Sequence, residues 1–211
     1  MSPRHAKALD GRVGDDPAAA LRAHLIDVTE GLLSRLPIAA ITTRDIARAA
    51  EVSDGVLYNY FEDKTALILA ALVSRYRRLA GRFYATFPVA GSATVEDNIV
   101  ALADGLLDLM VDVLPTFAGL LTEPILFHRL FAEIHSDELS PQYMEARLGE
   151  YLREEQRLGR LGPVDTSPVG TLLMGSVAVM ALGSHLAPIP DRGALSAKLT
   201  PIVATILRGL E

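Results

Sequence analysis

The residues best suited to chemistry in this chain lie between positions 42 and 64, where hydroxyl, amide and charged side chains follow one another closely. Asparagine can pair with adenine through two hydrogen bonds, tyrosine hydroxyls and cations can reach phosphate oxygens, and glycine lets the backbone approach a groove. These are contacts to nucleic acid and not steps of a reaction. The candidates are Thr42, Thr43, Arg44, Ser53, Asp54, Gly55, Tyr58, Asn59, Tyr60 and Lys64.

A short helix and a tight turn are predicted to position the first of these side chains. Thr42 precedes Asp45 by three residues, a spacing typical of a capping box at a helix start. Residues 51–53 would form the turn that follows, with Val52 buried and Ser53 as the N-cap of the next helix.

The second short helix is expected over residues 54–60. Val56 and Leu57 would face the first helix and pack with Ile46, which leaves the polar residues outward or on the flanks. This spacing is that of a helix-turn-helix, whose second helix enters the major groove of DNA. Periodicity alone leaves an ordinary helical hairpin as the alternative.

The motifs in this stretch also carry a resemblance. Thr-Thr-Arg-Asp-Ile-Ala, then Val-Ser, then Gly-Val-Leu-Tyr-Asn-Tyr-Phe, then Lys-x-x-Leu resembles the DNA-binding domain of TetR-family transcriptional regulators over about residues 20–72. The resemblance implies that Asp54, Gly55 and Asn59 lie near the bases. It implies contacts to the DNA backbone for the others, namely Thr42, Thr43, Arg44, Ser53, Tyr58, Tyr60 and Lys64.

Two residues depart from the usual pattern. Glu51 stands where such turns place glycine, and a positive φ there would cost a non-glycine residue about 1 kcal/mol. Asp54 stands at the tip of the reading helix, where a carboxylate would be repelled by phosphates unless it accepts from a cytosine amine. Either Asp54 selects a C·G pair or the operator is bound weakly.

The composition excludes several other classes of protein. Half of the 211 residues are hydrophobic and 22% are charged, so the chain can bury a core and is not disordered throughout. The formal charge of −6 excludes a polybasic DNA-coating protein. Residues 1–80 hold 11 basic and 10 acidic side chains, whereas residues 81–211 hold 9 and 16, so the acidity belongs to the second part.

Catalysis, cofactors and metals are not expected. Cysteine is absent, which excludes disulfides, thiolate nucleophiles and Cys-ligated metals. No catalytic spacing or phosphate-binding glycine loop is visible, so the chain is not predicted to be an enzyme. His128 and His135 lie seven residues apart, about 10 Å along a helix, which is too far for both to bind one ion easily.

Helical periodicity punctuated by prolines predicts an all-α chain of about nine helices. We expect a flexible tail at residues 1–16, a three-helix DNA-binding domain at residues 17–86, and a helical-bundle effector and dimerisation domain at residues 87–211. The first helix would end at Pro37. The helices expected after residue 90 cover residues 95–113 (stopping at Pro115), 116–122, 124–136, 141–160, 167–186 and 192–210.

The last two of these helices, residues 167–186 and 192–210, are expected to form a homodimer interface, as the resemblance implies. The first lacks charged residues and the second carries an apolar face, although both could instead belong to the core of one chain. Residues 169–187 are also long enough to cross a membrane, but flanking prolines and several polar side chains argue against a span. Residues 1–17 lack the apolar core of a secretory signal, so a cytoplasmic location is expected.

The resemblance further implies a small effector, mostly apolar, bound in the second domain. Most of the candidate contacts fit a plain helical core better than a ligand site, because aromatic and Met residues at helical spacing pack interiors by default. His128 and Arg147 are the two that could bind a polar or anionic end. The candidates are Leu106, Met110, Phe117, Leu121, Phe127, His128, Phe131, Tyr143, Met144, Arg147 and Met174.

The function that follows is a ligand-responsive DNA-binding regulator, a homodimeric repressor released from a pseudo-palindromic operator in double-stranded DNA. The alternative is a helical scaffold protein that does not bind DNA.

Overall fold

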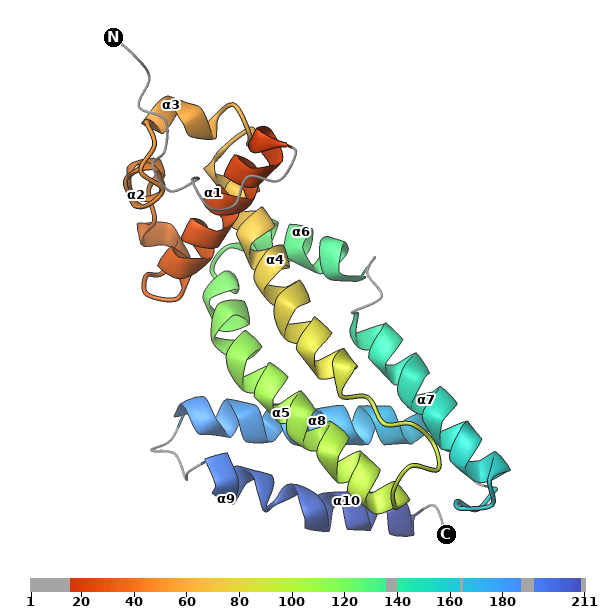
Figure 1. The fold of residues 1–211 in the computed structure, drawn as a ribbon. Helices are drawn as coiled ribbons and strands as arrows, with labels where there is room; N and C mark the ends of the chain where they lie inside the picture. The colour runs from red at the N-terminus through yellow and green to blue at the C-terminus, as the bar shows by residue number, and fades with distance from the viewer. Residues whose placement is uncertain (1–15, 136–139, 164, 187–191, 210–211) are drawn as a thin grey trace. The chain divides into compact units, whose positions relative to one another are not determined.

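The computed structural model describes residues 16–135, 140–163, 165–186 and 192–209, and within these ranges every regular element is a helix (Figure 1). The all-α prediction is therefore confirmed. The described part holds ten α-helices, of which the shortest two have four and five residues. They are α1 (Pro17–Leu33), η2 (a 3₁₀ turn, Ile38–Ala40), α2 (Thr43–Ala49), α3 (Asp54–Leu57), α4 (Lys64–Ala85), α5 (Val95–Leu120), α6 (Pro124–His135), α7 (Pro141–Arg157), α8 (Ser167–Leu186), α9 (Arg192–Ser196) and α10 (Leu199–Arg208).

The chain forms two compact units. We call them the N-terminal unit, Met1–Tyr76 with Gly119–Glu133, and the C-terminal unit, Arg77–Ala118 with Ile134–Glu211. Helices α4, α5 and α6 each contribute residues to both units. The predicted domain boundary at residues 86–87 stays a prediction, and the predicted tail lies outside the described residues except for Asp16.

The N-terminal unit is built on one apolar cluster. Asp16 begins α1 by accepting a hydrogen bond from the Ala18 backbone N–H (2.9 Å), and Pro17 fits the first helical position because it needs no N–H partner there. The helix ends at Leu33, four residues before the predicted stop at Pro37. Fully burying a Leu or Ile stabilises a fold by about 1.5–3 kcal/mol, so this small cluster can hold the short helices in place. Its members are Leu25, Ile41, Ile46, Ala47, Ala50, Leu57, Phe61 and Leu67.

In the C-terminal unit, the prediction that a helix stops at Pro115 is wrong. Helix α5 continues through this residue to Leu120 and so includes most of the predicted segment 116–122. Proline lacks an N–H, which leaves the Val111 carbonyl, four residues earlier, without its helical donor. The His185 ring donates from Nε2 to that carbonyl at 3.0 Å. A remote side chain thus replaces the lost helical bond.

The last predicted helix, residues 192–210, is also wrong as a single element. It is divided into α9 and α10 by a turn at residues 197–198. Pro201 cannot donate to the Ala197 carbonyl and its ring would clash with it, so a continuous helix is disfavoured here. In the new helix Pro201 occupies the first turn, where N–H groups have no helical partner.

A buried carboxylate holds the segment that connects α4 to α5. The Glu155 side chain on α7 is fully buried, and its Oε1 accepts from the backbone N–H of Gly91 at 3.1 Å. The Arg160 Nε lies 3.1 Å from Glu155 Oε2, and the same guanidinium donates to the Ala93 carbonyl. Burial raises the pKa of the neighbouring Tyr151 to about 12, although a hydrogen bond from Asn98 acts in the opposite direction.

Helix α8 packs against α7 and α10 and is the one described helix long and apolar enough to cross a membrane. Its mean hydropathy is 1.6. Length and composition alone are weak evidence for a span, because core helices of water-soluble proteins meet the same criteria.

Candidate nucleic-acid interface

Helix α2 begins with the predicted capping box. The Thr42 hydroxyl oxygen accepts from the Asp45 backbone N–H at 3.2 Å, and the Asp45 carboxylate accepts from the Thr42 backbone N–H at 3.1 Å. The Thr42 hydroxyl also donates to Asp45 at 2.6 Å. These hydrogen bonds favour the charged carboxylate and lower the pKa of Asp45 below its ordinary value. The start of α2 is therefore fixed by two side chains three residues apart.

The turn after α2 has the left-handed residue that the sequence suggested. Glu51 has a φ of 56°, and no other non-glycine residue of the described chain has a positive φ. The Glu51 N–H donates to the Arg48 carbonyl (3.2 Å) and the Val52 N–H to the Ala47 carbonyl (3.0 Å). This pair of bonds is a Schellman motif, which usually has glycine at the left-handed position. The turn therefore fixes the exit from α2 despite an unfavourable residue.

The second helix of the motif, α3, is shorter than predicted. It covers Asp54–Leu57, and residues 58–60 continue as a turn in which the N–H groups of Asn59 and Tyr60 donate three residues back. Hydrogen bonds between residues three apart give this last turn 3₁₀ geometry, in which side chains three positions apart lie on the same face. Ser53 occupies the N-cap position as predicted, but its side chain makes no capping bond.

The core between these helices agrees only in part with the prediction. Ile46 and Leu57 are buried, and Val52 is half-buried and packs against the cluster. Val56 is half-buried, so the apolar side of α3 rests mainly on Leu57.

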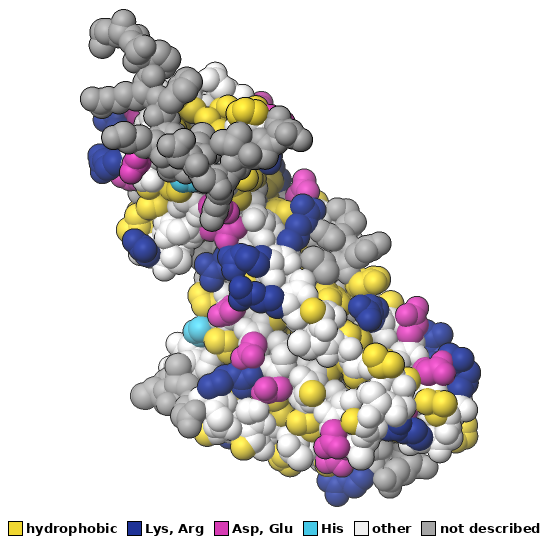
Figure 2. Space-filling view, in the orientation of Figure 1, with side chains coloured by type: hydrophobic (Ala, Val, Ile, Leu, Met, Phe, Trp, Pro, Cys, Tyr) yellow, Lys and Arg dark blue, Asp and Glu magenta, His cyan; other side chains and the backbone are white. Residues whose placement is uncertain are grey.

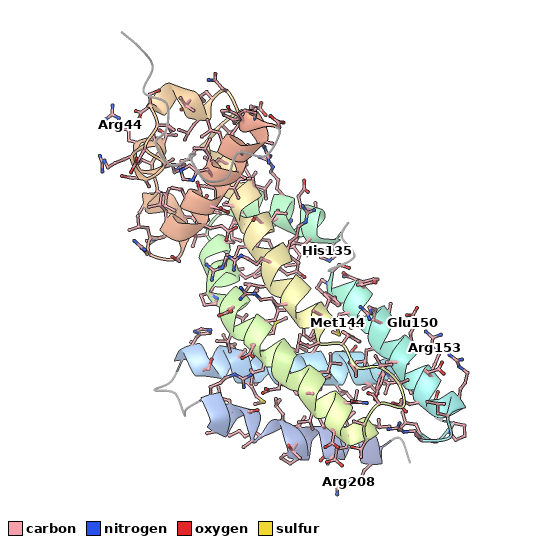
Figure 3. All side chains as sticks on the ribbon, viewed as in Figure 1. Arg44, His135, Met144, Glu150, Arg153 and Arg208 are labelled. Atoms are coloured by element: carbon pink, nitrogen blue, oxygen red, sulfur yellow. The ribbon has the colours of Figure 1, made fainter. Side chains whose placement is uncertain are left out.

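Most of the predicted contact residues are exposed. Arg44 projects from α2 away from the ribbon, with 82% of its side chain exposed (Figure 3), and Tyr58 is 59% exposed. Thr43, Tyr60 and Lys64 are half-buried instead. The exposed predicted residues are Thr42, Arg44, Ser53, Asp54, Gly55, Tyr58 and Asn59.

Two of the half-buried residues have structural contacts. Lys64 donates from Nζ to the Ile41 carbonyl at 2.9 Å and so ties the start of α4 to the residue before the capping box. Tyr60 packs against the apolar cluster. An ammonium group has three donors, so the bond to Ile41 leaves Lys64 able to bind a phosphate as well.

Asp54 has a cationic neighbour. Its Oδ2 lies 3.6 Å from the Arg44 Nε, and both side chains are exposed. Figure 2 shows acidic and basic side chains side by side over this part of the chain. An exposed pair of this kind contributes little to stability, about 0–1 kcal/mol. It does offset the negative charge at the tip of α3.

The sequence analysis did not predict Arg48 as a contact residue. Arg48 is exposed, lies one turn after Arg44 on the same face of α2, and is 3.7 Å from the Asp45 carboxylate. The four-residue spacing was the signal that could have identified it.

The predicted effector residues fall into both units. Leu121, Phe127, His128 and Phe131 belong to the N-terminal unit, and the other seven belong to the C-terminal unit. Leu121 is 71% exposed and His128 is also exposed, whereas Leu106 and Met144 are buried. The Phe127 and Phe131 rings pack 4.5 Å apart. The effector site therefore stays a prediction.

The helix-turn-helix region matches a known protein family. A family model described as "Bacterial regulatory proteins, tetR family" matches residues 25–71, which contain the core of the N-terminal unit and the whole turn. The N-terminal part of the chain is therefore similar to the DNA-binding region of TetR-family regulators. This agrees with the resemblance seen in the capping box and in the tyrosines after α3.

Two curated relatives match over part of the chain. An HTH-type transcriptional regulator BetI from Cronobacter sakazakii is 32% identical over 46% of this chain and 47% of its own length. An HTH-type transcriptional repressor KstR from Rhodococcus jostii is 34% identical over 29% of each protein. The matched region thus spans about half or less of these relatives.

The structural similarity to known proteins covers more of the chain than the sequence similarity does. The crystal structure of a TetR-family regulator from Mesorhizobium loti superposes with a TM-score of 0.71 at 16% identity, covering 92% of this chain and 98% of that one. The chain therefore shares the fold of that protein over nearly its whole length, including the C-terminal helices.

Proposed function

We propose that this protein is a ligand-responsive DNA-binding regulator of the TetR family that represses transcription as a homodimer. The observation that carries the proposal is the capped, left-handed turn that presents an exposed polar face at Asp54, Gly55, Tyr58 and Asn59, within the region matched by the family model. Two such faces, about 34–36 Å apart, would read successive major grooves of a pseudo-palindromic operator.

Within this proposal the exposed residues have different roles. Asn59 is the side chain that can read adenine, and Arg44, Arg48 and Tyr58 would bind phosphates. Lys64 would bind a phosphate while it holds the Ile41 carbonyl. The pair between Arg44 and Asp54 offers a reason why a carboxylate is tolerated close to DNA.

The dimer would form through residues 167–186 and 192–210. Helix α8 buries Leu173, Val177 and Ala181 against its own chain but leaves its opposite face open. That face spans about four turns at helical spacing and is too apolar for water. Its large apolar residues are Leu172, Val179, Leu182 and Leu186, with exposed fractions of 49–77%.

The effector would be a small, mostly apolar molecule bound in the C-terminal half. Helix α4 contributes residues to both units. A ligand that binds more tightly to one position of α4 would therefore change the distance between the helix-turn-helix motifs of the two protomers. We expect a cytoplasmic protein without membrane attachment, enzymatic activity, metal or cofactor.

DNA binding is tested by fluorescence anisotropy with the duplex that lies just upstream of the protein's own coding region. A scaffold protein would not bind it beyond a scrambled duplex of equal length. Asn59→Ala should relax base preference by about 1–3 kcal/mol at one position, whereas Arg44→Gln should weaken all sequences alike and reduce the salt slope by about one. An Asn59→Ala protein with unchanged affinity and preference would refute the proposed reading face.

The dimer is tested by sedimentation of Val179→Glu, which places a charge in the middle of the open α8 face. We expect monomers at micromolar concentration, because a buried unpaired charge costs several kcal/mol. Ser167→Glu is the matched control, since it adds the same charge at the exposed first residue of α8. Equal dimerisation of both variants would place the interface elsewhere.

A further inference from the structure

One arginine in the C-terminal unit has aromatic neighbours in place of an acidic partner. The Arg147 Cζ lies 4.7 Å from the centre of the Phe87 ring and 6.0 Å from that of Tyr143. Among the described residues, no carboxylate lies within 4.0 Å of this half-buried guanidinium, and no protein oxygen accepts from it. None of its nitrogens is among the buried unpaired atoms, so its donors remain accessible.

The neighbouring arginines differ from Arg147 in this respect. Arg153 donates to the Gly149 carbonyl at 3.1 Å, Arg157 pairs with Glu154, and Arg160 pairs with Glu155. Figure 3 shows Met144 on one side of α7 and Arg153 on the other. Arg147 is thus the half-buried cation of this segment whose charge no side chain of the described structure offsets.

The rings that support Arg147 form a connected aromatic cluster. Phe87 stacks on Tyr84 at 5.9 Å with 12° between the ring planes, and Tyr84 packs on Tyr143 at 5.6 Å. Phe83 meets Phe87 edge-on at 5.8 Å. The buried Tyr84 hydroxyl donates to the Ser140 carbonyl at 2.8 Å. The guanidinium therefore lies on a surface fixed by the end of α4 and the start of α7.

This arrangement suits an anion attached to an apolar body. A guanidinium presents a fork of N–H donors that matches a carboxylate or phosphate, and an aromatic face keeps it weakly hydrated and oriented. The rings beside it offer apolar contact. We propose that Arg147, on Phe87 and Tyr143, binds the anionic head of an amphipathic ligand, a carboxylate or a phosphate. The inference rests on the proposed function in taking that ligand as the effector.

The location couples such a ligand to α4. Phe87 follows the end of α4 at Ala85 by two residues, and the same connecting segment is held further along by Glu155 at Gly91. An anion bound by Arg147 on the Phe87 ring would change the packing of the residues that directly follow α4.

The test is isothermal titration of the full-length protein with dodecanoate, dodecyl phosphate, dodecanol and inorganic phosphate, below micelle-forming concentrations. We expect at least one of the two anionic amphiphiles to bind about tenfold or more tightly than dodecanol, as one charge-assisted bond allows. The tighter of the two names the head group. Inorganic phosphate should bind more weakly than either.

Arg147→Gln should lose this preference by about tenfold or more and keep the affinity for dodecanol. Arg153→Gln removes the same charge from the exposed side of α7 and should bind like the wild type. The inference is overturned if dodecanol binds as tightly as the anions, if neither anion binds, or if Arg147→Gln binds them unchanged.

The same proteins separate this inference from the proposed function. Arg147→Gln should bind operator DNA as the wild type does but resist release by the anionic amphiphile. A wild-type protein that binds the amphiphile and no DNA would contradict the proposed function and leave the anion site intact.

Discussion

The two units of the molecule hold their polar side chains in different ways. Around the helix-turn-helix, Thr42 and Asp45 bond to each other across three residues, on the surface. In the C-terminal unit, Glu155 bonds to Gly91 across 64 residues, and Arg192 to Asp108 across 84. Local hydrogen bonds form as soon as a helix forms, whereas remote ones need the assembled bundle. The start of α2 is therefore fixed by local bonds alone, independently of the second unit.

The contrast predicts that the bundle has single positions of large effect. Glu155→Ala should destabilise the protein by about 3 kcal/mol, because it leaves Arg160 and the Gly91 N–H without their buried partner. The measurement is urea unfolding followed by circular dichroism. Glu154→Ala, which removes an exposed pair with Arg157, is the control and should change stability by about 0.5 kcal/mol or less. Equal losses of stability in the two variants would show that the burial of Glu155 does not make its contacts more stabilising than those of Glu154.

A second prediction concerns the proline inside α5. His185→Ala should cost about 1 kcal/mol, because the Val111 carbonyl loses its donor. In a Pro115→Ala background the restored N–H can donate to the same carbonyl, so His185→Ala should then cost close to nothing. Unfolding midpoints of the four proteins give this coupling. An identical cost in both backgrounds would mean that the ring does not substitute for the helical bond.

The difference between local and remote hydrogen bonds explains why the sequence predicted the helices of the N-terminal unit better than those of the C-terminal unit. The capping box and the left-handed Glu51 follow from residues a few positions apart, and both are present. The continuation of α5 through Pro115 depends on His185, 74 residues from Val111, which no local pattern reveals. The sequence predicts Lys64 only as a phosphate ligand, because its bond to the Ile41 carbonyl joins positions 23 residues apart.

The candidate sites show the same limit. The exposed face of α3 could be assigned from periodicity, since Leu57 had to be buried and Asn59 was then left outward. The effector residues could not be assigned in this way, because apolar residues at helical spacing also form ordinary cores. Arg147 differs from Arg153 and Arg157 on the same helix because its guanidinium lies over rings assembled from α7 and the segment after α4.

A smaller effect should appear in the local unit at Glu51. Replacing it by glycine relieves the left-handed strain of about 1–2 kcal/mol but adds about 0.5–1 kcal/mol of chain entropy to the unfolded state. The net expectation is a stabilisation of about 0.5–1 kcal/mol. Thermal unfolding should show it, while Glu51→Ala, which keeps a Cβ at the same φ, should show no gain. A matching gain in the alanine protein would assign the effect to the lost charge.

The smallest effect should come from the capping box, and it depends on pH. The folded state holds the pKa of Asp45 below its unfolded value, so the carboxylate stabilises the fold above the unfolded pKa of about 4. This stabilisation is lost as the pH falls through the lower, folded pKa. Asp45→Asn should therefore be less stable than the wild type at pH 7, and the two should converge near pH 2.

The control for this experiment is Asp97→Asn, because Thr94 and Asp97 make a similar local pair at the start of α5 in the C-terminal unit. If both local pairs are equivalent, the two variants should lose similar stability at pH 7, and both should lose far less than Glu155→Ala. A loss at Asp45 that persists unchanged at pH 2 would show that its contribution does not come from the ionised carboxylate. The distinction between the units would then depend on packing around α2 and not on where the charged partners lie along the chain.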